Sequence, residues 1–342
     1  MKLKSADLLS TAQQLREFVL SFLQSPGFAA LPQSERFRRY YGPFVDVTKA
    51  ARYTRSLVNL LEAGGVFPAG KRFFDAGCGF GVSDAVLALL GASTVAGLEV
   101  YPDTVAVACA WAAHCKLALD FRLGRVEQSY LPTSSYDVVL CVEAISHFRY
   151  PSEFLKETWR VLRPGGVLVV ADDNNGDNMR VRRHLSAVWK RFEEGPAGTI
   201  GDHTVRIPYR QRRADLIMTY FPEFSPEQVK VLAEGTSGMA SDQILEACRN
   251  YAATGNPPQS FYREGQCPIE PLTNQYIENS LRPADLRREL IDLRFDASVR
   301  PHFGGETRGG AVKAANRIMS SVSYLRYLSP GYRVYARKAE AA

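Results

Sequence analysis

The spacing of apolar residues along this chain of 342 residues separates regions with different expected structures. Between residues 5 and 24 apolar side chains recur every three or four positions, which is typical of an amphipathic helix, and a second helix is expected over 46–63. Ser25-Pro26-Gly27 and Gly64-Gly65 are expected to end these helices. The first region, 1–70, is therefore predicted to be an N-terminal helical segment that acts as a lid or cap.

From residue 71 short apolar strands alternate with helical stretches. The pattern predicts strands at 72–76, 94–100, 120–123, 136–142 and 167–171, with helices at 82–90, 103–115 and 151–162. Such alternation indicates βαβ units and a parallel sheet covered on both faces. Ligands bind at the carboxyl ends of the strands in these sheets, so the residues after each strand are the candidates for function.

Residues 174–280 do not continue this alternation. Their pattern predicts four helices, near 177–194, 209–221, 226–234 and 241–253. A helix at 283–293 and strands at 294–300 and 332–337 then return to the earlier pattern. We therefore expect one α/β core, formed by 71–173 and 281–338, with a helical insertion at 174–280 before the last two strands.

Composition narrows the class of protein. Apolar residues make up 46% and charged residues 23%, which is ordinary for a globular protein. The net charge of +6 is spread thinly, so no nucleic-acid partner is expected, and no apolar run reaches the ~18 residues of a membrane span. Met1–Asp7 has no apolar core of a signal peptide, and the six cysteines form no CxxC pair. A cytoplasmic protein with reduced cysteines and no bound metal is expected.

The stretch Phe73-Phe74-Asp75-Ala76-Gly77-Cys78-Gly79-Phe80-Gly81 carries the strongest functional signal. An apolar strand ends in a carboxylate, and a loop with alternating glycines opens a helix. Glycines permit positive φ and close approach of a ligand to the backbone, while the helix start suits an anionic group. The NAD-type G-x-G-x-x-G spacing is broken at Val82. Asp75 would repel a pyrophosphate but suits a ligand that carries an ammonium group.

A second acid, Glu99, ends the next strand about 20 residues further along. A carboxylate at this position can accept hydrogen bonds from both hydroxyls of a ribose. The alternative is that Glu99 is a solvated charge at a strand end.

With these residues the chain resembles the class I S-adenosylmethionine-dependent methyltransferases. The first motif of that family corresponds to Asp75 through Gly81, and Glu99 takes the place of its ribose acid. Tyr136-Asp137-Val138-Val139 leads the fourth strand, and Leu162-Arg163-Pro164-Gly165-Gly166 precedes the fifth. The resemblance implies a Rossmann-like, doubly wound, mostly parallel sheet with an antiparallel edge hairpin. It implies S-adenosylmethionine as cofactor and S-adenosylhomocysteine as product, with Asp75, Gly77, Cys78, Gly79, Gly81 and Glu99 in contact.

The adenine side departs from the family pattern. Many relatives carry an Asp after the third strand, whereas this chain has Arg125 there, followed by Val126 and Glu127. Either Glu127 substitutes for the acid, or the backbone with Val100 and Val126 holds the adenine.

The fourth strand is followed by Glu143 and His147, which resemble the acid-plus-His segment of small-molecule methyltransferases. Four-residue spacing places both on one side of a helical turn. We expect His147 to accept or orient the acceptor proton and Glu143 to contact cofactor and orient the acceptor; alternatively His147 caps a turn. Asp172 and Asp173 after the fifth strand are either metal ligands, a base, or part of a loop that caps the next helix.

The insertion is expected to form the acceptor-binding lid. Its beginning is rich in arginine, which suits an anionic acceptor, although a solvated helix face explains the same pattern. Tyr40, Tyr41 and Tyr53 either close over the cofactor or belong to the core or surface. The predicted function is methyl transfer (EC 2.1.1) to a small metabolite or natural-product-like acceptor. The alternatives are a catalytically silent cofactor-binding protein and a macromolecule methyltransferase.

Overall fold

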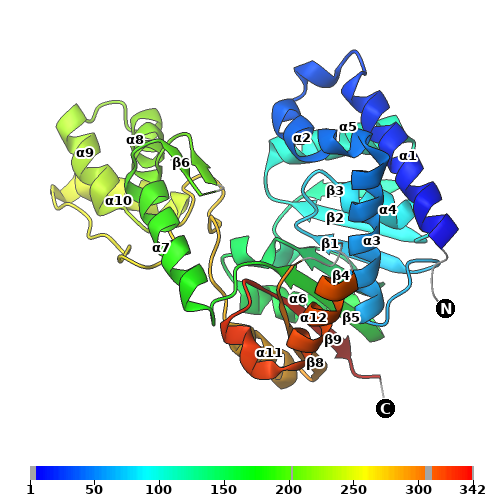
Figure 1. Ribbon diagram of the computed structural model, residues 1–342. Coiled ribbons are helices and arrows are strands. Elements are labelled where there is room, and N and C mark those ends of the chain that lie inside the picture. Colours follow the sequence, from blue (N-terminus) through cyan, green and yellow to red (C-terminus); the bar gives the residue numbers. More distant parts are fainter. Residues whose placement is uncertain (1–4, 202, 305–309, 341–342) are drawn as a thin grey trace. The chain divides into compact units, whose positions relative to one another are not determined.

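The computed structural model describes residues 5–201, 203–304 and 310–340 (Figure 1). Contacts divide the chain into two compact units. Unit 1 contains residues up to 145, 150–173 and 283 onward, and unit 2 contains 146–149 and 174–282. Met1–Lys4, part of the stretch on which the expected absence of a signal peptide rests, lies outside the described residues.

Unit 1 is built on a seven-stranded sheet with the order β3-β2-β1-β4-β5-β9-β8. The strands are β1 (Arg72–Ala76), β2 (Thr94–Glu99), β3 (Leu119–Leu123), β4 (Tyr136–Val142), β5 (Leu162–Asp172), β8 (Phe295–His302) and β9 (Gly331–Lys338). The first five pair in parallel, and β9 is antiparallel to both neighbours. The prediction of a doubly wound, mostly parallel sheet with antiparallel edge pairing is confirmed.

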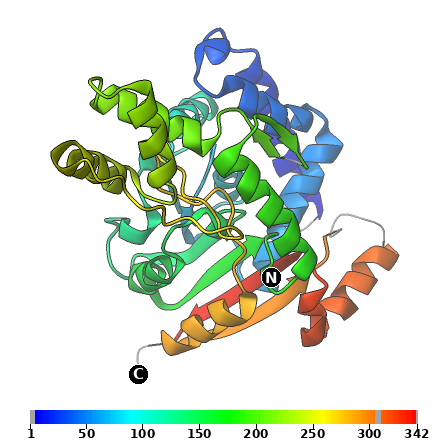
Figure 2. The same ribbon diagram turned by 90° about the vertical axis from the view of Figure 1, so that its left-hand side faces the viewer.

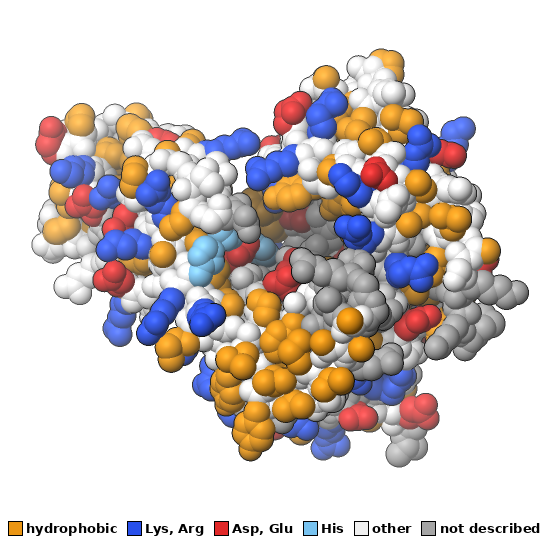
Figure 3. Space-filling view, in the orientation of Figure 1, with side chains coloured by type: hydrophobic (Ala, Val, Ile, Leu, Met, Phe, Trp, Pro, Cys, Tyr) orange, Lys and Arg blue, Asp and Glu red, His pale blue; other side chains and the backbone are white. Residues whose placement is uncertain are grey.

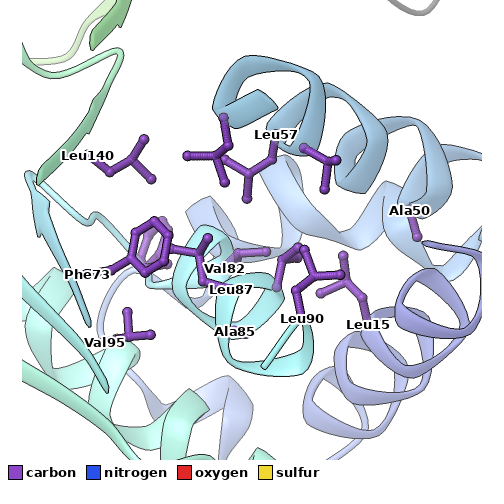
Figure 4. Packing of buried hydrophobic residues seen from close by; sticks show 14 of the residues in the cluster. Leu15, Ala50, Leu57, Phe73, Val82, Ala85, Leu87, Leu90, Val95 and Leu140 are labelled. Carbon is purple, nitrogen blue, oxygen red and sulfur yellow. The ribbon is translucent and has the colours of Figure 1, made fainter. Parts of the chain in front are cut away.

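One face of the sheet packs against α1 (Ser5–Leu23), α3 (Val47–Ala63), α4 (Val82–Leu89) and α5 (Pro102–Cys115). Figure 4 shows members of this cluster from the N-terminal helices (Leu15 and Leu57) and from the strands (Phe73 and Leu140), with Val82 and Leu87 of α4 between Leu15 and the strands. Each of these side chains is buried, so the N-terminal helices share the hydrophobic core of the sheet. Burial of each such side chain contributes about 1.5–3 kcal/mol to folding.

The helix α2 (Ser34–Tyr41), which is rich in aromatic and basic residues, was not predicted from the sequence. Phe37 explains it: this residue is fully buried, and its ring centroid lies 5.2 Å from that of Phe22 and 5.5 Å from that of Phe80. This helix has only eight residues and little apolar periodicity of its own. The tertiary contacts of the Phe37 side chain therefore stabilise it.

The opposite face is covered by α6 (Pro151–Val161) and α11 (Pro283–Asp292). Lys338 of β9 places its ammonium group 4.7 Å from the centroid of the Trp159 ring in α6. Figure 2 shows β9 beside β8 at the edge of the sheet. These two strands are not joined by a tight turn, because α12 (Gly310–Ser321) and the 3-10 helix η5 (Ser323–Tyr327) lie between them.

Unit 2 contains α7 (Met179–Glu194), α8 (Tyr209–Tyr220), α9 (Pro226–Gly235), α10 (Ser241–Thr254) and the two-stranded sheet of β6 (Gly198–Ile200) and β7 (His203–Val205). It has a core of its own, with Ile217, Leu232 and Ile244 fully buried. A buried ion pair joins Arg213 of α8 to Glu193 of α7 at 2.5 Å. Throughout the described residues, no helix combines the length and apolarity needed to cross a membrane.

Candidate functional site

The glycine loop follows β1, the central strand between β2 and β4. Gly77, Gly79 and Gly81 all have positive φ, at 84°, 55° and 73°. The backbone N–H groups of Gly77 and Cys78 both donate to the carbonyl of Leu98 in β2, at 3.0 Å each. The glycines thus adopt the positive φ that the sequence led us to expect, and hydrogen bonds to the neighbouring strand fix the position of the loop.

Two glycines of this loop have different surroundings. A Cβ at Gly81 would lie 2.1 Å from the ring of Phe121, so the loop there packs directly on β3. A Cβ at Gly79 would meet no protein atom within 4 Å. The open side of the loop is therefore at Gly79, where a ligand can approach the backbone closely.

The thiol of Cys78 faces the core rather than the open side of the loop. The side chain is 8% exposed and packs with Ala108, Ala112 and Phe121. Burial raises the pKa of this thiol well above its usual value, so the group is neutral. Cys78 can therefore serve a ligand only through its backbone.

Glu99 ends β2 beside the loop, since β1 and β2 pair in register up to Ala76 and Leu98. Its Oε1 accepts hydrogen bonds from the backbone N–H groups of Val100, at 2.7 Å, and Tyr101, at 3.0 Å. These bonds hold the carboxylate at the strand end in one orientation. Glu99 thus lies at the end of β2, as predicted, and its contact with a ribose stays a prediction.

The residues considered for the adenine side follow β2 and β3. Val126 is buried at the start of the 3-10 helix η3 (Val126–Gln128), and Val100 is partly buried after β2. Arg125 places its guanidinium 3.5 Å from the carboxylate of Glu127. Both Glu127 oxygens are buried, and no described residue hydrogen-bonds to them. A donor such as an amino group would satisfy this carboxylate, which favours the first of the two adenine alternatives.

The sequence analysis missed a further acid at the loop, Asp84 in the first turn of α4. Its side chain is fully buried and lies within hydrogen-bonding reach of Asp75, which is 4% exposed. Burial raises the pKa of Asp75 to about 7. The sequence did contain a signal, because Asp84 is a lone acid in the apolar helix Val82–Leu89.

The N-terminal helices reach this acidic pair. Tyr53 of α3 hydrogen-bonds through its hydroxyl to the hydroxyl of Ser83, at 2.7 Å. Burial raises the pKa of both Tyr41 and Tyr53, and the charges of Asp75 and Asp84 raise it further. Tyr40 is instead half exposed. Two of the three tyrosines considered from the sequence thus lie beside the loop.

Glu143 follows β4 in a left-handed conformation, with φ of 50°. Its backbone N–H donates to the carbonyl of Ala171 at 2.7 Å, and its carboxylate accepts from the N–H of Asp173 at 3.1 Å. The predicted helical turn from Glu143 to His147 is therefore wrong: the 3-10 helix here spans only Ile145–His147. The backbone of Glu143 is used to join β4 to β5 instead.

The carboxyl of Glu143 lies in acidic surroundings. Although the side chain reaches solvent, protein atoms surround it closely, and this desolvation with the charges of Asp172 and Asp173 raises its pKa to about 8. Arg333 of β9 opposes the effect, and its guanidinium lies 3.4 Å from Asp173. Such a carboxyl exchanges protons near neutral pH, which a general base requires. Within the described residues no three potential ligands form a metal site.

The edge strands add residues that sequence reasoning did not single out. Burial and the charge of Arg333 lower the pKa of His302 in β8 to about 4, so this imidazole is neutral at pH 7. The hydroxyl of Tyr332 is buried without a hydrogen-bond partner among the described residues. The pairing of β5 with β9 and of β9 with β8 brings these residues to the same end of the sheet as Asp172.

His147 belongs to unit 2. Its carbonyl accepts from the N–H of Tyr276 at 3.0 Å, and the carbonyl of Ser146 accepts from the N–H of Asn279 at 2.6 Å. The segment 146–149 is thus hydrogen-bonded to the last part of the insertion. Glu143 and His147, predicted as one constellation, are parts of different units.

Several arginines of the insertion already have acidic partners. Arg212 pairs with Glu270 at 2.7 Å, and Arg213 pairs with Glu193. Figure 3 shows basic and acidic side chains interspersed over the face that it draws. Arg180, Arg182 and Arg183 of α7 are exposed. That the acceptor is anionic stays a prediction. Because Arg212 and Arg213 are paired with acids, fewer arginines support it than the sequence suggested.

The chain is similar to several known proteins. Residues 74–170 match the family described as a methyltransferase domain. The chain is 32% identical over 157 residues to the 2-methyl-6-phytyl-1,4-hydroquinone methyltransferase of Synechocystis sp., covering 42% of this chain and 46% of that protein. It is 35% identical over 103 residues to the ubiquinone biosynthesis O-methyltransferase of Parvibaculum lavamentivorans, covering 30% and 40%. The chain thus spans less than half the length of these curated relatives.

A solved structure described as an S-adenosylmethionine-dependent methyltransferase from Mesorhizobium loti is similar over 82% of this chain and 97% of its own. The sequence identity is 17% and the TM-score is 0.44.

Proposed function

We propose that this chain, which contains a class I S-adenosylmethionine-dependent methyltransferase domain, is an enzyme that transfers a methyl group from S-adenosylmethionine to a small-molecule acceptor. The observation that carries the proposal is the placement of the open glycine loop after β1 beside the oriented carboxylate of Glu99 after β2. A ligand that carries both an amino acid and a ribose fits this pair of features.

The residues present suit this cofactor. Gly77, Cys78, Gly79 and Gly81 would receive its amino-acid part along their backbone, and the carboxyl of Asp75 would bind its ammonium group. Glu99 would accept the ribose hydroxyls. Val100 and Val126 would pack against the adenine, with Glu127 accepting its amino group. When bound, the cofactor supplies a methyl group already activated by the positive sulfur.

On the acceptor side, Glu143 is assigned the role of taking the proton of the acceptor. Its raised pKa allows it to take a proton from a hydroxyl or an acidic carbon near neutral pH. His147 is a second candidate for the same proton. The names of the two relatives concern a hydroquinone and ubiquinone, so hydroquinones and other phenols are the first acceptors to test.

The test begins with isothermal titration of S-adenosylmethionine and S-adenosylhomocysteine. We expect micromolar binding that Glu99→Ala weakens tenfold or more, because hydrogen bonds to a charged group contribute ~1.5–3 kcal/mol. NAD and NADP serve as control ligands that should not stabilise the protein in a thermal-shift assay. No binding by folded protein would refute the proposal.

Turnover is then measured by mass spectrometry with a panel of hydroquinones and phenols. Glu143→Gln should lower kcat with little effect on cofactor affinity if Glu143 takes the proton. If His147→Ala keeps near-normal turnover on the true acceptor, His147 is not the base. Cofactor binding without transfer to any acceptor class would favour a catalytically silent protein.

A further inference from the structure

Asp84 is a buried acid to which the proposed reaction gives no role. It lies three residues after Gly81, in the first turn of α4, and its side chain is 0% exposed. No other described residue donates a hydrogen bond to either carboxyl oxygen. An ionised carboxylate buried in this way costs several kcal/mol, so the group requires a proton or a positive partner.

The polar neighbour that the structure provides is another carboxyl, Asp75. The two side chains lie within hydrogen-bonding reach of each other. Two carboxylates can only accept hydrogen bonds, so a bond between them requires that one carries a proton. Burial raises the pKa of Asp75 to about 7, and burial with the charge of Asp75 raises the pKa of Asp84 well above its usual range.

The groups that surround the pair do not supply the missing positive charge. Burial raises the pKa of Tyr41, Tyr53 and the thiol of Cys78, so all three are neutral at pH 7. Glu99 adds negative charge and raises the pKa of Asp75. Two further neighbours interact with these groups through their charge. The charge of Asp75 raises the pKa of the buried thiol of Cys141, and the charge of Arg36 lowers the pKa of Tyr41.

We propose that Asp75 and Asp84 share one proton in the cofactor-free protein and that the ammonium group of S-adenosylmethionine displaces this proton on binding. The O–H bond of one carboxyl breaks, the proton passes to the solvent, and an N–H group of the cofactor donates to the freed carboxylate. This inference rests on the proposed function, because the ammonium group belongs to that cofactor. Asp84 then acts as a positioning residue that supplies the second negative charge.

The sign of the pH dependence follows from this exchange. Lowering the pH returns the proton to the Asp75–Asp84 pair and so opposes cofactor binding. The affinity for the cofactor therefore rises with pH, by at most about tenfold per pH unit. An α-amino group in model peptides loses its own proton at about pH 7.7–8.0. The effect is therefore measured between about pH 5.5 and 7.

The experiment is isothermal titration of S-adenosylmethionine at pH 6.5 in two buffers that differ in ionisation enthalpy. We expect the wild-type protein to release about half to one proton per bound cofactor. Asp84→Asn should release none and lose the pH dependence of affinity. Asp103→Asn removes an exposed acid from the first turn of α5 and serves as the matched control, which should behave as wild type. Methylthioadenosine lacks the ammonium group and should release no proton.

The outcomes separate the two proposals. Binding without proton release, or equal release by Asp84→Asn, overturns this inference and leaves the proposed function intact. No binding of S-adenosylmethionine or S-adenosylhomocysteine by folded wild-type protein overturns both. If Asp84→Asn does not fold, infrared spectroscopy of the wild type provides the decision. A protonated carboxyl buried in the protein gives its own carbonyl stretching band. If this band is present in the free protein and disappears when the cofactor binds, the proposal is supported. If the free protein shows no such band, the proposal is refuted.

Discussion

The two glycines Gly79 and Gly81 provide a sharp test of how the loop is built. Replacing either by Ala places a side chain at positive φ, which costs roughly 1–2 kcal/mol. At Gly81 the new Cβ also meets the ring of Phe121 at 2.1 Å, where carbon atoms normally remain about 3.5–4.0 Å apart. Overpacking of this kind costs a further ~1–3 kcal/mol. We therefore expect Gly81→Ala to destabilise unit 1 by about 2–5 kcal/mol and Gly79→Ala by about 1–2 kcal/mol.

The assay is urea unfolding at 25 °C, followed by tryptophan fluorescence. Trp111 and Trp159 lie in unit 1, whereas Trp189 lies in unit 2, so a Trp189→Phe background reports unit 1 alone. Gly79→Ala should have the larger effect on cofactor affinity, because its Cβ enters the open side of the loop.

A double-mutant cycle with Phe121→Ala isolates the close contact. Removing the ring should reduce the cost of Gly81→Ala by at least about 1 kcal/mol, since residues in direct contact show coupling of this size. Equal costs for the two glycine substitutions, together with no coupling to Phe121, would refute the argument that close packing on β3 positions the loop.

Three further predictions concern charge. Glu99→Gln keeps one oxygen for the backbone N–H groups of Val100 and Tyr101, so isothermal titration should show a smaller loss of cofactor affinity than for Glu99→Ala. The pKa of Glu143 is raised in the folded state, so the folded protein binds more protons than the unfolded chain. The free energy of unfolding should therefore fall as the pH rises from about 4.5 to 8. Urea unfolding at several pH values should show a shallower fall for Glu143→Gln. Arg213→Ala should destabilise unit 2 by about 3–5 kcal/mol in unfolding followed through Trp189, because it leaves Glu193 buried and unpaired, whereas replacing both members by apolar residues should cost less.

The sequence by itself determined most of the fold of unit 1. Short apolar runs and helical apolar patterns located its strands and most of its helices, because β1 and β4 are almost entirely buried and each covering helix has one apolar face. It also located the loop and Glu99, because positive φ at alternate positions and an acid at a strand end are local requirements. The Rossmann-like type of sheet and the cofactor came from the resemblance to a known family.

Tertiary structure decided what depends on contacts between distant residues. Phe37 forms α2 by packing on rings from four other segments, and Asp84 matters only because the chain folds it against Asp75. Spacing suggested that Glu143 and His147 share a helical turn, but hydrogen bonds from Glu143 to the β5 end and from Tyr276 to His147 direct them into different units. Burial and charge act through space, so the proton-binding groups of this protein become visible only when the chain is folded.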